Sequence, residues 1–142
     1  MRRLDAWRTG KRAWVPALLW SVTIFGLSSI PGHALPQLPR WWNADKFAHL
    51  AIYGVLGALC WFGARGTLPP GRGWAAQVTV AVLIATLYGI TDEAHQSFVP
   101  MRSPDVYDVI ADAGGALIGA LLCVAIVSRD RVREVIARRA DG

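Results

Sequence analysis

Ionisable side chains in the middle of this chain gather where hydrophobic segments begin or end. His49 follows Asp45 by four residues at the start of one apolar run, and Asp92 and Glu93 close another. Asp112 lies just inside a third run. A histidine beside a carboxylate can act as a general base or as a nucleophile, with Asp45 as the predicted residue that orients His49. Charges are costly to hold at the edge of hydrocarbon, so these clusters predict a functional site.

The clusters repeat at intervals of three or four residues. This spacing places side chains on one face of a helix, so each cluster is expected to form a stripe. Glycines that continue the last stripe would let a neighbouring helix approach closely. The three stripes are Asp45, His49 and Tyr53; Asp92, Glu93 and Gln96; and Asp108 and Asp112, followed by Gly115 and Gly119.

Two cationic residues, Lys46 and Arg102, accompany these acids and indicate a phosphate-bearing ligand. The three stripes are expected to face one another around a small pocket. Arg102 lies in the segment 97–105, which is expected to cover this pocket, and its guanidinium can bind a phosphate through two hydrogen bonds. The carboxylates outnumber the cations, so protons or a divalent metal must compensate. Glu93, Asp108 and Asp112 are the predicted metal ligands, and oxygen ligands suit Mg²⁺, Mn²⁺ or Ca²⁺. The predicted catalytic residues are His49, Asp45, Glu93 and Asp112, and the predicted substrate contacts are Lys46, Tyr53, Asp92, Gln96 and Arg102.

Several of these residues have a simpler structural explanation when each is taken alone. Asp45 and Asp108 could serve only as helix N-caps. Lys46 could extend to a lipid phosphate at the membrane surface. His49 and Asp112 resist such explanations because each lies inside an apolar run. The combination therefore favours a functional site over purely structural roles.

The elements that must position these residues are long apolar runs. Hydrophobic residues make up 54% of the 142 residues. Each run has 18 to 20 residues, enough at about 1.5 Å per residue to cross a bilayer core of roughly 30 Å. We predict an all-α, four-transmembrane-helix bundle that forms a single membrane domain over residues 1–142. The predicted spans are 13–30, 47–64, 74–91 and 109–128, followed by a basic tail at 129–142.

The distribution of basic residues predicts the orientation of the bundle. The two ends and the loop 65–73 hold twelve Lys and Arg residues, whereas the other two connections hold three. Basic loops remain in the cytoplasm, so both termini are predicted to be cytoplasmic. All three polar clusters then meet on the outer face, towards the periplasm or exterior of a bacterial inner membrane. The net charge of +5 suits anionic lipids, and basic residues that only flank spans argue against a nucleic-acid partner.

Two segments leave alternatives open. The first span follows basic residues and precedes Gly32-His33-Ala34, which resembles a signal-peptidase site, but its apolar run exceeds the 7–15 residues usual in a signal peptide. The tail is expected to be solvated and close to the membrane surface. The spacing of Val132, Val135 and Ile136 also allows a helical extension of the fourth span.

The motifs in order resemble those of the VanZ-like family of small membrane proteins. One feature departs from the family pattern, because Asp112 stands where asparagine is common. The resemblance implies a helical membrane fold and a possible relation to enzymes that act on lipid head groups. The family takes its name from a protein linked to resistance to the glycopeptide teicoplanin. The matching elements are Asp45-Lys46-x-x-His49 with Tyr53, Asp92-Glu93-x-x-Gln96-x-Phe98-Val99-Pro100, Arg102, and Asp108 with Gly115 and Gly119.

The sequence therefore predicts an enzyme that hydrolyses or transfers a phosphoester in membrane lipids or lipid-linked cell-envelope precursors. The alternative is a non-enzymatic protein that binds envelope lipids and alters glycopeptide susceptibility. A small transporter or proton relay is a third interpretation, and alternating access would then require a homo-oligomer. Replacement of a positioned carboxylate by a shorter one, as in Glu93→Asp, separates the first two, because only an enzyme should lose orders of magnitude in activity.

Overall fold

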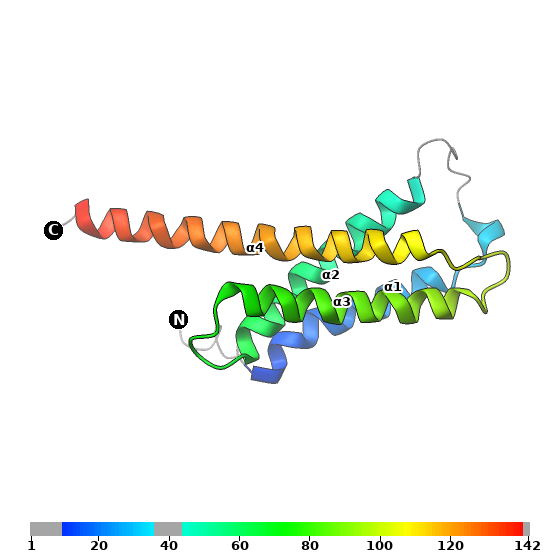
Figure 1. Cartoon of the computed structure of the whole chain (residues 1–142), viewed down its shortest axis with the longest axis horizontal. Helices are drawn as coiled ribbons and strands as arrows, with labels where there is room; N and C mark the ends of the chain where they lie inside the picture. The colour runs from blue at the N-terminus through cyan, green and yellow to red at the C-terminus, as the bar shows by residue number, and fades with distance from the viewer. Residues whose placement is uncertain (1–9, 36–43, 141–142) are drawn as a thin grey trace.

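Helices make up most of the described residues, and no strand occurs among them. This structure is a computed structural model, and it describes residues 10–35 and 44–140. The helices pack along one another as an elongated bundle, and the last helix extends beyond the others at one end (Figure 1). The all-α prediction is confirmed for these residues. The elements are η1 (Gly10–Trp14), α1 (Val15–Ser28), η2 (Gly32–Ala34), α2 (Ala44–Thr67), α3 (Trp74–Gln96) and α4 (Val106–Ala140).

Three of the helices are long and apolar enough to cross a membrane, namely α2, α3 and α4 over Val106–Arg138. The predicted first span is instead divided between the 3-10 helix η1 and the 14-residue α1. Pro16 explains the division, because proline is tolerated in the first turn of an α-helix and disrupts its interior. An α-helix of 14 residues rises only about 21 Å. The structure thus has three candidate spans where the sequence predicted four.

The three long helices extend beyond their predicted ends. Helix α2 starts three residues before the predicted span 47–64 and ends three residues after it, and α3 continues five residues past 91. Helix α4 continues through the basic tail to Ala140, so the helical interpretation of the tail is the one that the structure adopts. The polar clusters consequently lie within helical turns and have fixed positions on helix faces. Some basic residues used to predict the orientation lie outside the described residues, namely Arg2, Arg3, Arg8 and Arg40.

Glycines allow α2 and α4 to pack with their backbones in close contact. A Cβ atom added at Gly115 would collide with the backbone carbonyl of Leu50, and one added at Gly119 would collide with that of Gly54. Small residues at such positions are typical of helix pairs in membranes. The predicted role of Gly115 and Gly119 in close helix approach is confirmed.

Helix α1 joins the bundle through aromatic side chains. The indole Nε1 of Trp20 donates to the carbonyl of Ile52 at 3.0 Å, and the hydroxyl of Tyr88 donates to the carbonyl of Ser21 at 2.6 Å. These two bonds tie α1 to α2 and to α3. The outer surface remains apolar, as a lipid-facing bundle requires. Exposed apolar residues include Leu18, Leu19, Val22, Leu83, Leu87 and Leu122.

The connections between the helices lie at two opposite ends of the bundle. The start of η1, the connection between α2 and α3 and the extension of α4 lie towards one end, and the connection between α3 and α4 lies at the other (Figure 1). This arrangement gathers the first turns of α2 and α4 and the last turns of α3 at the second end. The polar clusters of the sequence belong to these turns.

Candidate functional site

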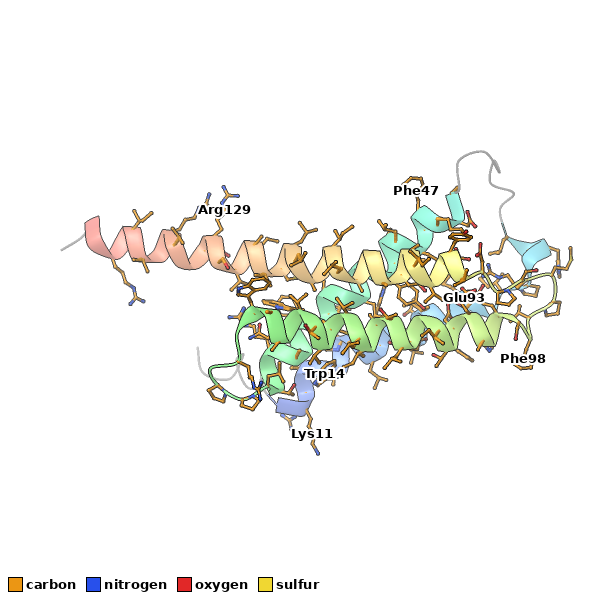
Figure 2. All side chains as sticks on the ribbon, viewed as in Figure 1. Lys11, Trp14, Phe47, Glu93, Phe98 and Arg129 are labelled. Carbon is orange, nitrogen blue, oxygen red and sulfur yellow. The ribbon has the colours of Figure 1, made fainter. Side chains whose placement is uncertain are left out.

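Side chains from α2, α3 and α4 converge where α3 passes into α4. His49 comes from α2, Glu93 from α3, and Asp108 and Asp112 from α4. One ligand atom each of His49, Glu93 and Asp108 lies within 4.8 Å of the others. Figure 2 shows Glu93 at this end of the bundle. The expected meeting of the three clusters is present in the structure.

His49 and Asp112 form a close pair between α2 and α4. The Nδ1 atom of His49 lies 2.9 Å from Oδ1 of Asp112, whose side chain is fully buried. The structure assigns the orienting bond to Asp112 and not to Asp45, which is largely exposed and pairs with Lys46 at 3.2 Å. The close glycine packing of α2 against α4 is the physical reason, because it brings a carboxylate of α4 to the imidazole ring.

Gly89 makes room for this carboxylate. A Cβ atom at Gly89 would lie 2.6 Å from Oδ2 of Asp112 and 3.2 Å from its Cβ. The absence of a side chain at this turn of α3 therefore leaves room for the carboxylate of Asp112. Sequence reasoning missed Gly89, although a glycine four residues before Glu93 on the same helix face was a usable signal.

Lys46 closes the outer edge of the site by pairing with carboxylates from two segments. Its Nζ lies 2.5 Å from Asp105 and 2.6 Å from Asp108, in addition to the bond to Asp45. Asp105 was not among the predicted site residues. The bond from Lys46, with a second from the backbone N–H of Tyr107, holds the pKa of Asp105 below its ordinary value. Lys46 therefore acts as a bridge between α2 and the start of α4.

Glu93 lies at the centre of the site, and among the described residues only one of its two carboxylate oxygens has a hydrogen-bond partner. Its Oε2 accepts a hydrogen bond from the backbone N–H of Asp105 at 2.8 Å. Its Oε1 is buried and has no hydrogen-bond partner among the described residues. The residues close enough to share a metal ion are His49, Glu93 and Asp108. This set differs from the predicted one in having His49 in place of Asp112, which contacts the imidazole instead.

A second polar group lies beside the first and joins α1 to α3. Oδ2 of Asp92 accepts hydrogen bonds from Oγ of Ser28 at 2.9 Å and from Nε2 of Gln96 at 3.1 Å. All three side chains are buried. The ring of Tyr53 stacks nearly parallel to that of His49, with centroids 6.2 Å apart. Ser28 was missed because it lies at the end of an apolar run with no charged neighbour.

Arg102 lies in the turn between α3 and α4, as expected from its position in the sequence. Its backbone N–H bonds to the carbonyl of Val99 at 3.2 Å, and its Nε is buried. Within residues 10–35 and 44–140, no ion pair connects Arg102 to the acidic cluster. The structure thus brings Lys46 into the site and leaves the guanidinium outside the ion-pair network.

A separate cleft of about 470 Å³ lies towards the opposite end of the bundle. It is lined by the aromatic and basic residues Trp61, Arg65, Arg72 and Trp74, together with the part of α4 around Val124. Tryptophan and arginine are typical of the membrane–water interface. This cleft is remote from His49 and forms no part of the acidic site.

The helices and the polar cluster define a small helical membrane protein with an acidic site between helix ends. The sequence matches the family model described as VanZ/LLP1 over residues 5–128, which is most of the chain. The protein therefore belongs to the VanZ/LLP1 family, and the predicted resemblance is confirmed. Comparison with curated proteins and with solved structures gives no match.

Proposed function

We propose that this protein is a membrane-embedded enzyme that hydrolyses or transfers a phosphoester in a lipid head group or a lipid-linked envelope precursor. The observation that carries this proposal is the contact between the partly exposed His49 and the fully buried Asp112, beside the buried Glu93 at one end of an apolar bundle. Ionisable residues inside membrane helices are expensive to retain and typically serve a function. A site at the ends of the helices would lie near the head-group layer, where phosphoesters are found.

The chemistry follows from the orientation of the imidazole. Asp112 occupies Nδ1 of His49, so Nε2 is the nitrogen available to a reactant. In hydrolysis, Nε2 removes a proton from a water molecule while the oxygen of that water bonds to phosphorus. The bond from phosphorus to the leaving alcohol breaks, and the proton passes to that alcohol. Lys46, which lies in the cluster, and Arg102, in the turn that follows α3, are the cations that we expect to bind the phosphate.

We further propose four membrane spans, with both termini in the cytoplasm and the site facing outward from a bacterial cytoplasmic membrane. Together η1 and α1 cover Gly10–Ser28, and their summed rise is about 31 Å, close to a bilayer core. Twelve of the fifteen basic residues would then lie on the inner side. The cleft bounded by tryptophan and arginine would lie at the inner head-group level.

A vesicle assay tests the enzymatic proposal. The purified protein would be reconstituted with labelled phospholipids or polyprenyl phosphates, with and without divalent cations, and head-group release or transfer measured. We expect turnover by the wild type and its loss in His49→Gln. His95→Gln is the matched control, because His95 lies on the same end of α3 but contacts Ser29 outside the cluster.

The outcomes separate the two classes of function. Absence of turnover with every lipid class would contradict the enzyme and favour a protein that only binds envelope lipids. Glu93→Asp adds a second criterion, since moving a catalytic carboxylate by one methylene should lower the rate by orders of magnitude. A binding protein should tolerate that change with little loss.

A further inference from the structure

We propose that His49, Glu93 and Asp108 bind one divalent transition-metal ion, and that Asp112 positions His49 for this purpose. The inference concerns the same site as the proposed function, on which it rests, and deepens it. It is nevertheless testable on its own, because metal binding can be measured without any substrate.

The spacing of the three ligand groups is close to that of a metal site. Their nearest ligand atoms all lie within 4.8 Å of one another, and Nε2 of His49 is 3.9 Å from Oδ2 of Asp108. Metal–nitrogen and metal–oxygen bonds of about 2.0–2.2 Å place neighbouring ligands roughly 3–4 Å apart. The imidazole and the carboxylate are too far apart for a hydrogen bond but well spaced to share an ion.

Glu93 supplies an independent sign that the site takes a cation. The residue is 5% exposed, and Oε1 is a buried acceptor without a partner among the described residues. Leaving such an acceptor unsatisfied is unfavourable, because it has lost its water. Its other oxygen is fixed by the backbone of Asp105, so Oε1 is held in place. A metal ion would satisfy it.

The bond between His49 and Asp112 has the form of an outer-shell contact. Metal-bound histidines commonly donate their second ring N–H to a carboxylate, which fixes the tautomer and the ring orientation. Here Nδ1 is bonded to the fully buried Asp112, and Nε2 faces Asp108. Asp112 is therefore a positioning residue, which accounts for its absence from the three ligands.

Charge also favours a dication at this position. Lys46 bonds to Oδ1 of Asp108 and leaves Oδ2 for another partner. The other bonds of Lys46 go to Asp45 and Asp105, so none reaches Glu93 or Asp112. One lysine thus serves three carboxylates, so compensation for the buried Glu93 and Asp112 must come from a proton or from another cation.

The donor set selects among metals. One imidazole nitrogen with two carboxylates suits Mn²⁺ or Zn²⁺, whereas Ca²⁺ and Mg²⁺ prefer oxygen donors alone. The mixed donor set therefore favours transition metals over the hard cations Mg²⁺ and Ca²⁺. A metal ion on Nε2 would replace the proposed role of His49 as the base, because one lone pair cannot bind a metal and accept a proton at once; a water bound to the ion would then supply the nucleophile.

The test is metal titration of the purified full-length protein in detergent. After treatment with chelator, Mn²⁺ binding would be followed by the loss of the free-ion electron paramagnetic resonance signal, and Zn²⁺ by competition. We expect one site per chain. His49→Gln, Glu93→Gln and Asp108→Asn should each weaken binding at least about 100-fold, and Asp112→Asn by about 10- to 100-fold, as for outer-shell partners.

Two variants control for non-specific attraction by the acidic cluster. Asp45→Asn removes a charge that pairs with Lys46 without touching the three ligands, and His95→Gln removes an imidazole outside the cluster. Both should leave Mn²⁺ affinity within about threefold of the wild type. If Asp45→Asn weakens binding as much as the ligand variants, the acids only attract cations diffusely and the proposal is overturned.

Folding and function are distinguished within the same experiment. Helix content is checked by circular dichroism, and Glu93→Asp, which retains a carboxylate, replaces Glu93→Gln if the latter misfolds. Turnover of lipid without metal binding would overturn the metal site and leave His49 as the base. One bound Mn²⁺ per chain without turnover would support the site and contradict the proposed enzyme.

Discussion

Replacement of Gly115 by alanine should destabilise both the bundle and its polar site. The new Cβ would lie less than 3 Å from the backbone carbonyl carbon of Leu50 and close to the amide nitrogen of Gly54. Both neighbours are backbone atoms of α2, which cannot rotate away as a side chain would. The clash can be relieved only if α2 and α4 separate, and the same movement lengthens the contact between His49 and Asp112.

The magnitude follows from comparison with Gly114, its neighbour on α4. An alanine at Gly114 meets nothing within 4 Å, so it should gain up to about 1 kcal/mol from helix propensity. Overpacking at Gly115 should cost about 1–3 kcal/mol, offset in part by the same propensity gain. The free energies of unfolding of these two variants should thus differ by roughly 1–3 kcal/mol, although both add one methyl group to adjacent residues.

Thermal or denaturant unfolding in detergent, followed by circular dichroism, measures this difference directly. Gly115→Ala should melt below the wild type, and Gly114→Ala at or above it. Mn²⁺ affinity should fall in Gly115→Ala and remain unchanged in Gly114→Ala. Equal stability of the two variants would refute the close packing of α2 against α4 and the account of the site that depends on it.

Two further substitutions probe the polar groups separately. Gly89→Ala should retain the fold but displace the carboxylate of Asp112, since the added Cβ meets a flexible side-chain oxygen at 2.6 Å. We expect Mn²⁺ affinity to fall tenfold or more while the melting temperature changes little. Ser28→Ala should lower the free energy of unfolding by about 1–3 kcal/mol, because Asp92 loses a buried donor. Ser21→Ala, which loses only a bond within its own helix, should cost less than half as much in the same melting assay.

The positions of α2, α3 and α4 could be predicted because each contains a long apolar run. The ends of these helices could not be predicted. An apolar run ends at the first charged residue, whereas the helix continues past that residue when its charge has a buried partner. Asp92 is an example, since Ser28 and Gln96 satisfy it inside the bundle. The division of the first span follows from Pro16, whose effect on where the α-helix starts outweighs uniform hydrophobicity.

The sequence predicted which residues form the site better than it predicted which of them contact one another. Alternating spans place the three clusters at one end, and this required only the order of the segments. The partner of His49 required knowledge of which helices touch. Spacing along one helix favoured Asp45, whereas the glycine contact between α2 and α4 supplies Asp112. Contacts within a helix can be read from sequence spacing, but contacts between helices depend on backbone distance.

Asp112 links the packing of the protein to its chemistry. Asparagine at this position could accept the same hydrogen bond from Nδ1 of His49 without bringing a charge into the bundle. Aspartate instead places a second oxygen against Gly89, buried and without a partner among the described residues. A carboxylate in such a place is unfavourable unless a proton neutralises it or a nearby cation compensates for its charge. Lys46 is already shared by three other acids, so a dication bound through His49 would provide the missing charge on the far side of the imidazole ring.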